Sequence, residues 1–183
     1  MNAERDKTLL LLRHAKSAWP DVPDHERPLA GRGRRDAPIV GRWLRESDRA
    51  PEQVLCSTAR RARETWQLAQ TTLNADPPVA FEAGIYGASS AELLDLIRDL
   101  PSRIRTAIVV GHDPAIQDVA LELSAVSSGT DADSATTAAL DRMRTKFPTA
   151  AVAVLSFGGP WSKLTARQAR LAAFVTPRDL AAR

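Results

Sequence analysis

The sequence predicts an α/β fold of three layers, in which helices cover both faces of a mostly parallel central sheet. Short continuous apolar runs, typical of strands buried on both faces, alternate with helical patterns of about 10 to 15 residues. The chain has 183 residues, of which 44% are hydrophobic and 26% charged, and this composition suits a packed core rather than a disordered chain. We therefore expect a single domain over residues 1–183, with its core at about residues 8–180.

Two strand–helix units are predicted at the start of the chain. The continuous apolar run at residues 8–12 indicates a buried strand. Residues 34–45 carry apolar side chains at helical spacing with arginines between them, and Pro38 is expected in the first turn of this helix or as a distortion of it. A second strand is predicted over residues 53–57 and a second helix over residues 59–73.

The middle of the chain repeats this alternation. A weak strand is predicted at residues 79–81, and a helix over residues 90–100. Ser90 is the expected N-cap of that helix, because its hydroxyl can accept from the free amides of the first turn. A continuous apolar run predicts a strand over residues 106–110, and the helix that follows it ends near residue 124.

The C-terminal part supplies the last strands. Residues 127–134 are polar and contain glycine, so a mobile loop is expected there. Strands are predicted over residues 150–157 and 169–175, followed by a short tail at residues 177–183. In sheets of this class, ligands bind beyond the carboxyl ends of the strands. The residues that follow the strands are therefore the candidates for function.

Composition narrows the classes of function. The net charge is +3 and almost all of the basic residues are arginines, which suit phosphate or carboxylate groups. No nucleic-acid partner is expected, since the arginines are not interleaved with aromatic residues. Cys56 is the single cysteine, so an internal disulfide and a cysteine-based metal cluster are excluded. Neither a membrane span nor a secretory leader is recognisable, and we expect a cytoplasmic protein without a membrane partner.

Basic side chains follow three of the predicted strands. Arg13 and His14 follow the first strand, Arg61 follows the second, and His112 follows the fourth. Because these strand ends meet at one edge of the sheet, the four side chains are expected to surround one anion. Arginine offers a fixed fork of donors to phosphoryl oxygens, and histidine offers either a donor or a nucleophilic nitrogen. The pattern favours phosphoryl chemistry.

Three segments in order along the chain resemble the motifs of the histidine phosphatase, or phosphoglycerate mutase-like, superfamily. They are Leu12-Arg13-His14-Ala15-Lys16-Ser17, Ser57-Thr58-Ala59-Arg60-Arg61-Ala62-Arg63-Glu64-Thr65 and Val110-Gly111-His112-Asp113-Pro114. Within this superfamily the Arg-His-Ala-Lys-Ser variant resembles the SixA-like branch, the phosphohistidine phosphatases. Residues 24–29 and 174–180 also resemble that branch. The resemblance extends over residues 8–180.

The resemblance implies roles for four residues. His14 would attack phosphorus and form a covalent phosphohistidine, which water then hydrolyses. Arg13 and Arg61 would hold the phosphoryl oxygens, and His112 would donate to them. The activity implied is that of a metal-independent phosphatase that needs no cofactor.

Further candidates are less sharply defined. Glu82 is the available general acid, and Asp24 and Asp113 are its rivals. The candidate substrate-binding residues are Ser17, Arg27, Ser57 and Tyr86. Seven other residues are expected to have no part in the site. His25 is expected to be a solvated loop residue, and Arg60 and Arg63 are expected to face solvent or to pair with Glu64. The four tryptophans are expected to be packing residues: Trp19, Trp43, Trp66 and Trp161.

A chain of this length leaves little room for the helical insertion that covers the pocket in larger mutase relatives. We therefore expect an open, shallow site that suits a phosphohistidine on a protein surface. Two alternatives stay open. One is a phosphomonoesterase or mutase that acts on a small phosphorylated metabolite, and the other is a non-catalytic module that binds a phosphorylated residue without turnover.

Overall fold

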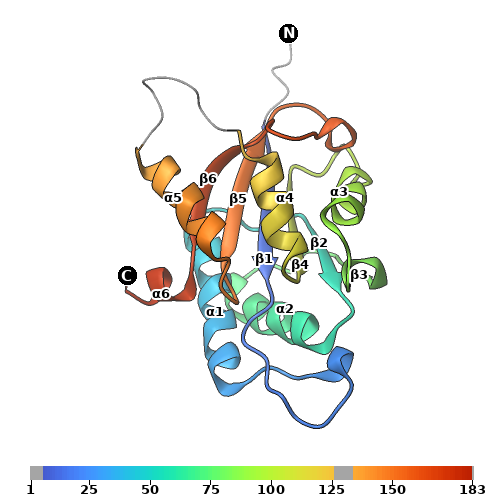
Figure 1. The fold of residues 1–183 in the computed structure, drawn as a ribbon, viewed down its shortest axis with the longest axis vertical. Coiled ribbons are helices and arrows are strands. Elements are labelled where there is room, and N and C mark those ends of the chain that lie inside the picture. Colours follow the sequence, from blue (N-terminus) through green and yellow to red (C-terminus); the bar gives the residue numbers. More distant parts are fainter. Residues whose placement is uncertain (1–5, 126–133, 183) are drawn as a thin grey trace.

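The computed structural model describes residues 6–125 and 134–182. Within these residues six strands form one sheet in the order β3-β2-β4-β1-β5-β6 (Figure 1). The strands are β1 (Lys7–Arg13), β2 (Gln53–Ser57), β3 (Val79–Glu82), β4 (Thr106–Gly111), β5 (Val152–Phe157) and β6 (Arg170–Val175). All pairings among β1 to β4 are parallel, whereas β5 is antiparallel to both of its neighbours. The mostly parallel sheet predicted from the sequence is confirmed.

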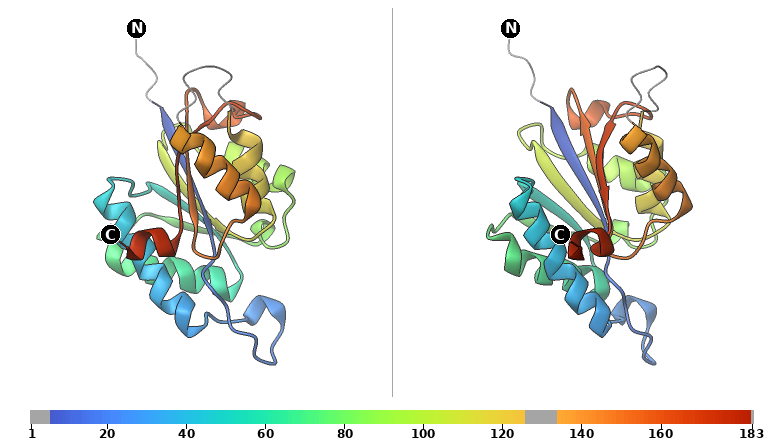
Figure 2. Two further views of the ribbon diagram at one scale, coloured as in Figure 1. Left: turned by 60° about the vertical axis from the view of Figure 1, so that its left-hand side comes forward. Right: turned by 90° about the vertical axis from the view of Figure 1, so that its left-hand side faces the viewer.

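Helices cover both faces of the sheet (Figure 2). They are α1 (Gly31–Glu46), α2 (Arg60–Leu73), α3 (Ser90–Arg98), α4 (Ala115–Leu123), α5 (Ser134–Thr145) and α6 (Pro177–Ala181). Leu9 and Leu11 of β1 are buried on the face covered by α3, α4 and α5, while Leu10 and Leu12 are buried on the face covered by α1 and α2. The continuous apolar run of β1 therefore serves two cores, as expected for a central strand.

The helix boundaries differ from the prediction at several points. Helix α1 begins at Gly31, so Pro38 lies in the interior of the helix rather than in its first turn. The N-cap of α3 is Ser89 and not Ser90, because Glu92 accepts from the Ser89 amide and thereby completes a capping box. Helix α5 was not predicted, and only Leu140 and Met143 of it are buried.

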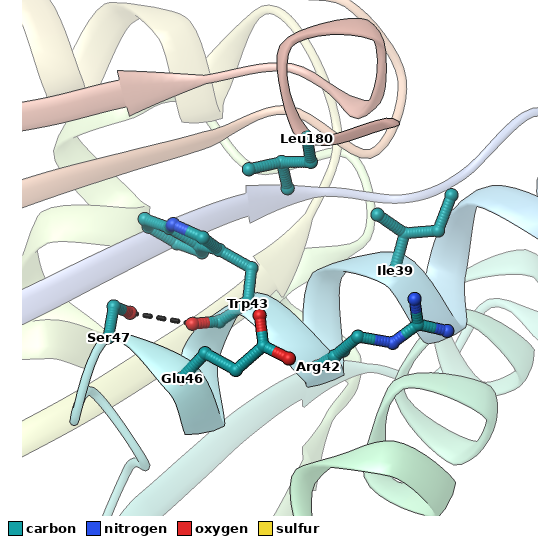
Figure 3. Close-up of a pocket in the computed structure, with 6 residues that line it drawn as sticks. All are labelled: Ile39, Arg42, Trp43, Glu46, Ser47 and Leu180. Carbon is teal, nitrogen blue, oxygen red and sulfur yellow. Dashed lines mark hydrogen bonds between the residues drawn. The ribbon is translucent and has the colours of Figure 1, made fainter. Parts of the chain in front are cut away.

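The C-terminal tail also contains more structure than expected. Helix α6 begins at Pro177, is capped by Thr176, and lies against α1. Leu180 of α6 and Trp43 of α1 line a cavity of about 310 Å³ between the two helices (Figure 3). The predicted mobile loop lies outside the described residues, except for Ser134 at the start of α5. None of the helices within the described ranges combines the length and apolar character needed to cross a bilayer.

Close approach of helix and loop positions the chain that follows β1. A Cβ at Gly33 of α1 would overlap the Lys16 carbonyl oxygen, so only glycine lets the helix approach this backbone. The same carbonyl accepts from the Ala30 amide at 2.8 Å. The segment directly after His14 is therefore held against the N-terminal turns of α1.

Candidate active site

The carboxyl ends of β1 and β4 bring two histidines together. The His14 amide donates to the carbonyl of Gly111, the last residue of β4, at 3.0 Å. The ring centroids of His14 and His112 are 5.2 Å apart, with an angle of 54° between the ring planes. Ninety-eight residues of sequence separate these rings, and the parallel pairing of β1 with β4 places them side by side.

A hydrogen-bond chain joins this point to α2. The Ala15 amide donates to Thr65 Oγ1 at 2.9 Å, and the Thr65 hydroxyl donates to the Arg61 carbonyl at 2.6 Å. Thr65 is fully buried. The backbone beside His14 and the first turn of α2, which carries Arg61, are thus held at a fixed separation.

The surroundings of His14 select one tautomer. Its Nδ1 lies 2.8 Å from the Ala15 carbonyl oxygen. Since a carbonyl can only accept, Nδ1 carries the proton and Nε2 keeps its lone pair. Burial lowers the pKa of this imidazole from 6.5 to about 3 against the opposing effect of the Ala15 carbonyl, and the nearby His112, Arg61 and Arg13 lower it further. His14 is therefore neutral near pH 7, with a nucleophilic nitrogen.

His112 is neutral for similar reasons. Burial lowers its pKa from 6.5 to about 4, and the positive charge of Arg61 contributes to this shift. Its Nε2 lies 2.8 Å from the hydroxyl oxygen of Ser57, the last residue of β2. The same hydroxyl accepts from the Ala59 amide at 3.3 Å. Ser57 thus joins a third strand end to the pair of rings.

Arg13, the last residue of β1, is fixed by two hydrogen-bond acceptors. Its Nη1 donates to the Phe147 carbonyl and to Asp113 Oδ2, each at 2.6 Å. Burial raises the pKa of the Asp113 carboxyl, and the charge of Arg13 opposes that rise. Asp113, a predicted rival for the general acid, is therefore tied to Arg13.

Asp24 accepts hydrogen bonds from Arg61, Arg27 and Tyr86. Arg61 donates from Nη1 to the Asp24 backbone oxygen at 2.7 Å and from Nη2 to its Oδ2 at 3.1 Å. Arg27 donates to Oδ1 at 2.9 Å and the Tyr86 hydroxyl to Oδ2 at 2.8 Å. The bonds from Arg27 and then from Tyr86 hold the pKa of Asp24 far below its usual range. Asp24 is thus ionised near pH 7 and has no proton to give as a general acid.

The other predicted binding residues lie on the same network. The Arg27 guanidinium donates to Ser17 Oγ at 2.6 Å and is itself buried. The Tyr86 ring meets His112 edge to face, with the centroids 5.6 Å apart. Arg27 and Tyr86 therefore share Asp24 as an acceptor beside the histidine pair, and Ser17 joins this network through Arg27.

Two residues lie elsewhere than the sequence suggested. His25 of the short helix η1 (Asp24–Glu26) is not simply solvated, because its Nε2 lies 3.0 Å from Thr58 Oγ1 and its ring packs against Tyr86 at 5.0 Å. Glu82 ends β3 and lines a groove with Leu96 of α3, and it makes no described contact with either ring of the histidine pair. The structure does not bring Glu82 into the cluster.

The prediction that all four tryptophans pack is wrong for one of them. Trp43, Trp66 and Trp161 are buried, but Trp19 is 77% exposed. The Arg27 guanidinium lies 3.2 Å from the centre of its ring. Arg60 pairs with Glu64 at 2.8 Å, as expected.

The cluster offers the donors and the nucleophile that phosphoryl transfer requires. The positive charges of Arg61 and Arg13 each lower the pKa of both histidines. Across residues 6–125 and 134–182, no group of three histidine, cysteine or carboxylate side chains is arranged to hold a metal ion.

Comparison with known proteins identifies the family of this arrangement. A sequence model of the histidine phosphatase superfamily (branch 1) matches residues 9–171. An uncharacterised protein of Mycobacterium tuberculosis is 42% identical over 168 residues, which cover 91% of this chain and 100% of that protein.

Solved structures show the same architecture. The candidate phosphohistidine phosphatase SixA of Nakamurella multipartitia is 35% identical, with a TM-score of 0.81 over 94% of this chain and 96% of that one. The candidate phosphohistidine phosphatase SixA of Agrobacterium tumefaciens is 29% identical, with a TM-score of 0.73 over 93% of this chain and 98% of that one.

Proposed function

The chain belongs to the histidine phosphatase superfamily, and on that premise we propose that it is a metal-independent phosphatase acting through a covalent phosphohistidine on His14. Membership of the superfamily and the likeness to the SixA structures support a phosphatase activity. The observation that carries the proposal is the state of the His14 ring. Its Nδ1 is bonded to the Ala15 carbonyl, and among the described residues no hydrogen-bond partner occupies its Nε2, which lies in a buried surrounding with the positive charges of Arg61 and Arg13.

In the first step, the Nε2 lone pair of His14 attacks phosphorus in line with the leaving group. The Nε2–P bond forms while the bond from phosphorus to the leaving nitrogen or oxygen breaks, and the leaving group takes up a proton from solvent water. Arg13 and Arg61 hold the equatorial oxygens, and His112 donates a hydrogen bond to one of them. Each arginine has donors beyond those used by Asp113 and Asp24, because a guanidinium carries five N–H groups.

In the second step, water attacks the phosphorus of phosphohistidine. The Nε2–P bond breaks, the electron pair returns to His14, and inorganic phosphate leaves. The same donors stabilise the negative charge in both steps, so one set of side chains serves the whole cycle.

We propose a phosphohistidine protein as the substrate class. A phosphoramidate bond needs less help from an acid than a phosphate ester does. This fits a site in which Asp24 is ionised, Asp113 is bound to Arg13, and Glu82 lies in the groove beside α3. The proteins of the two SixA structures are candidate phosphohistidine phosphatases, and the similarity of this chain to them supports the same substrate class.

A substrate panel tests this proposal. Phosphate release is measured in the presence of EDTA from free phosphohistidine, a phosphohistidine protein and a set of sugar phosphates, with His14→Ala as the inactive control. We expect turnover of the phosphohistidine substrates that EDTA does not reduce. Efficient release from sugar phosphates alone favours a small-molecule phosphomonoesterase, and tight binding without any release favours a non-catalytic module.

A further inference from the structure

The segment at residues 17–29, here called the rim segment, carries exposed apolar side chains next to the candidate site. It follows β1 and projects beyond the edge of the sheet, as the blue loop at the bottom of Figure 1 shows. Four large apolar side chains are exposed among the described residues: Trp19 at 77%, Phe81 at 50%, Val22 at 42% and Tyr86 at 38%. Trp19 and Val22 belong to the rim segment, and Tyr86 lies beside it through its bond to Asp24. Only Phe81, on β3, lies outside this group.

The rim segment is a built surface rather than a loose loop. Arg27 stacks on Trp19 and is fixed by Ser17 Oγ and by the Ala18 carbonyl, the latter at 3.0 Å. The two ends of the segment are joined, because the Ala18 amide donates to the Pro28 carbonyl at 2.9 Å. Trp19 is thus held in place with most of its ring facing solvent. Large exposed aromatic surface of this kind marks interaction sites.

The position of the rim indicates the size of its ligand. A phosphoryl group bound at His14 lies beside His112, whose ring is 5.6 Å from exposed Tyr86. Neither Trp19 nor Val22 has a described contact with the two histidines or with the two arginines proposed to hold the phosphoryl group. When the phosphorylated side chain belongs to a protein, however, the surface around that side chain comes to rest on the rim. Trp and Tyr are two of the residue types that dominate binding energy at protein interfaces, and both are exposed here.

We propose that Trp19, Val22 and Tyr86 form the docking surface for the protein that carries the phosphoryl group. This inference rests on the proposed phosphohistidine phosphatase function. The partner is a folded protein with apolar surface around its phosphohistidine. The rim is also joined to the proposed catalytic groups, since Arg27 under Trp19 and the Tyr86 hydroxyl both donate to Asp24, which holds Arg61.

The test compares two substrates with the same scissile P–N bond. The probes are free phosphohistidine and a small histidine phosphocarrier protein loaded with phosphoramidate, and kcat/KM is measured for each. The quantity of interest is the ratio of protein to free phosphohistidine. The variants are Trp19→Ala and Val22→Asp, with Trp19→Phe as the conservative change, and Phe81→Ala is the control for loss of an exposed apolar side chain away from the rim.

We expect the wild-type protein to prefer the phosphoprotein, and Trp19→Ala and Val22→Asp to lower the ratio by about tenfold, the effect of losing one central interface residue. Trp19→Phe restores most of the ratio, and Phe81→Ala leaves it unchanged. Absence of a preference in the wild type, an unchanged ratio in both rim variants, or an equal fall in Phe81→Ala overturns the docking surface while the phosphatase function stands. If the protein hydrolyses neither of the two probes, the proposed function itself is overturned.

Discussion

Arg61 donates two hydrogen bonds to Asp24, from Nη1 to the Asp24 backbone oxygen at 2.7 Å and from Nη2 to the Asp24 carboxylate at 3.1 Å. A second pair is formed by Arg13 and Asp113, with Nη1 of Arg13 2.6 Å from Oδ2 of Asp113. Each of the two proposed phosphate-binding arginines therefore has its own aspartate. An arginine that is already oriented before the substrate arrives loses less freedom on binding, and its remaining donors are aimed at the phosphoryl group in advance.

Loss of the Arg61 guanidinium is expected to be costly for turnover. Arg61→Ala should lower kcat/KM by about 10²–10³-fold, as for the removal of one donor to a developing anion. Arg61→Lys should recover only part of this, because an ammonium cannot form the planar fork. Arg60→Ala is the matched control, since Arg60 is the preceding residue on α2 and pairs with Glu64 at the surface. Similar rates for Arg61→Ala and Arg60→Ala would remove Arg61 from the site.

Asp24 should affect the rate of the reaction more than substrate binding. Asp24→Asn keeps the shape of the side chain but removes the charge that orients Arg61, so kcat should fall by about tenfold, the worth of one partly exposed charge-assisted hydrogen bond. KM should not rise, because the site gains positive charge. Steady-state kinetics with free phosphohistidine separates the two constants. A higher KM with an unchanged kcat would contradict this positioning role.

Buried His14 and half-buried His112 should not titrate near neutral pH. Burial disfavours the charged imidazolium and lowers the pKa to about 3 for His14 and about 4 for His112, so both rings stay neutral as the pH falls from 8 to 5. The ring-proton NMR signals of these residues, assigned with His14→Gln and His112→Gln, should therefore move over this range by only a small fraction of a full titration shift. A midpoint near pH 6.5 for either ring would show that it is more solvated than the structure indicates.

Gly33 is expected to matter for both stability and activity. Gly33→Ala places a methyl group against the Lys16 carbonyl and should destabilise the fold by about 1–3 kcal/mol, as overpacking does. It should also slow turnover, because it displaces the backbone next to His14. Gly31→Ala, at the exposed start of the same helix, should change the free energy of unfolding by no more than about 0.5 kcal/mol. Urea unfolding of both variants makes the comparison, and equal effects would contradict the close approach at Gly33.

The arrangement of the sheet and of the two histidines could be predicted because both depend on local pattern and on one topological rule. The apolar runs of β1, β2 and β4 identify parallel strands, and such strands present their carboxyl ends at one edge. His14 and His112 follow two of these strands directly. Their proximity, with ring centroids 5.2 Å apart, thus follows from their place in the sequence.

The partners of Arg61 could not be predicted in this way. Asp24 lies in the short helix η1, 37 residues before Arg61, and Tyr86, which donates to Asp24, follows it by 62 residues. No periodic pattern fixes where such short segments fold. The exposure of Trp19 could not be predicted for the same reason. Tryptophan is on average a largely buried residue type, and the exposed position of Trp19 depends on how the rim segment folds. Helix α5 was missed because it buries little apolar surface and has a weak amphipathic pattern.

The proposed reaction depends on a covalent bond between Nε2 of His14 and phosphorus. Brief incubation with ³²P-labelled phosphoramidate, quenched in alkaline detergent, detects this bond. We expect a base-stable, acid-labile label that maps to Nε2 of His14 and is absent in a folded His14→Ala variant. A label that persists in that variant, or turnover by the wild-type protein without any phosphoenzyme, would contradict it.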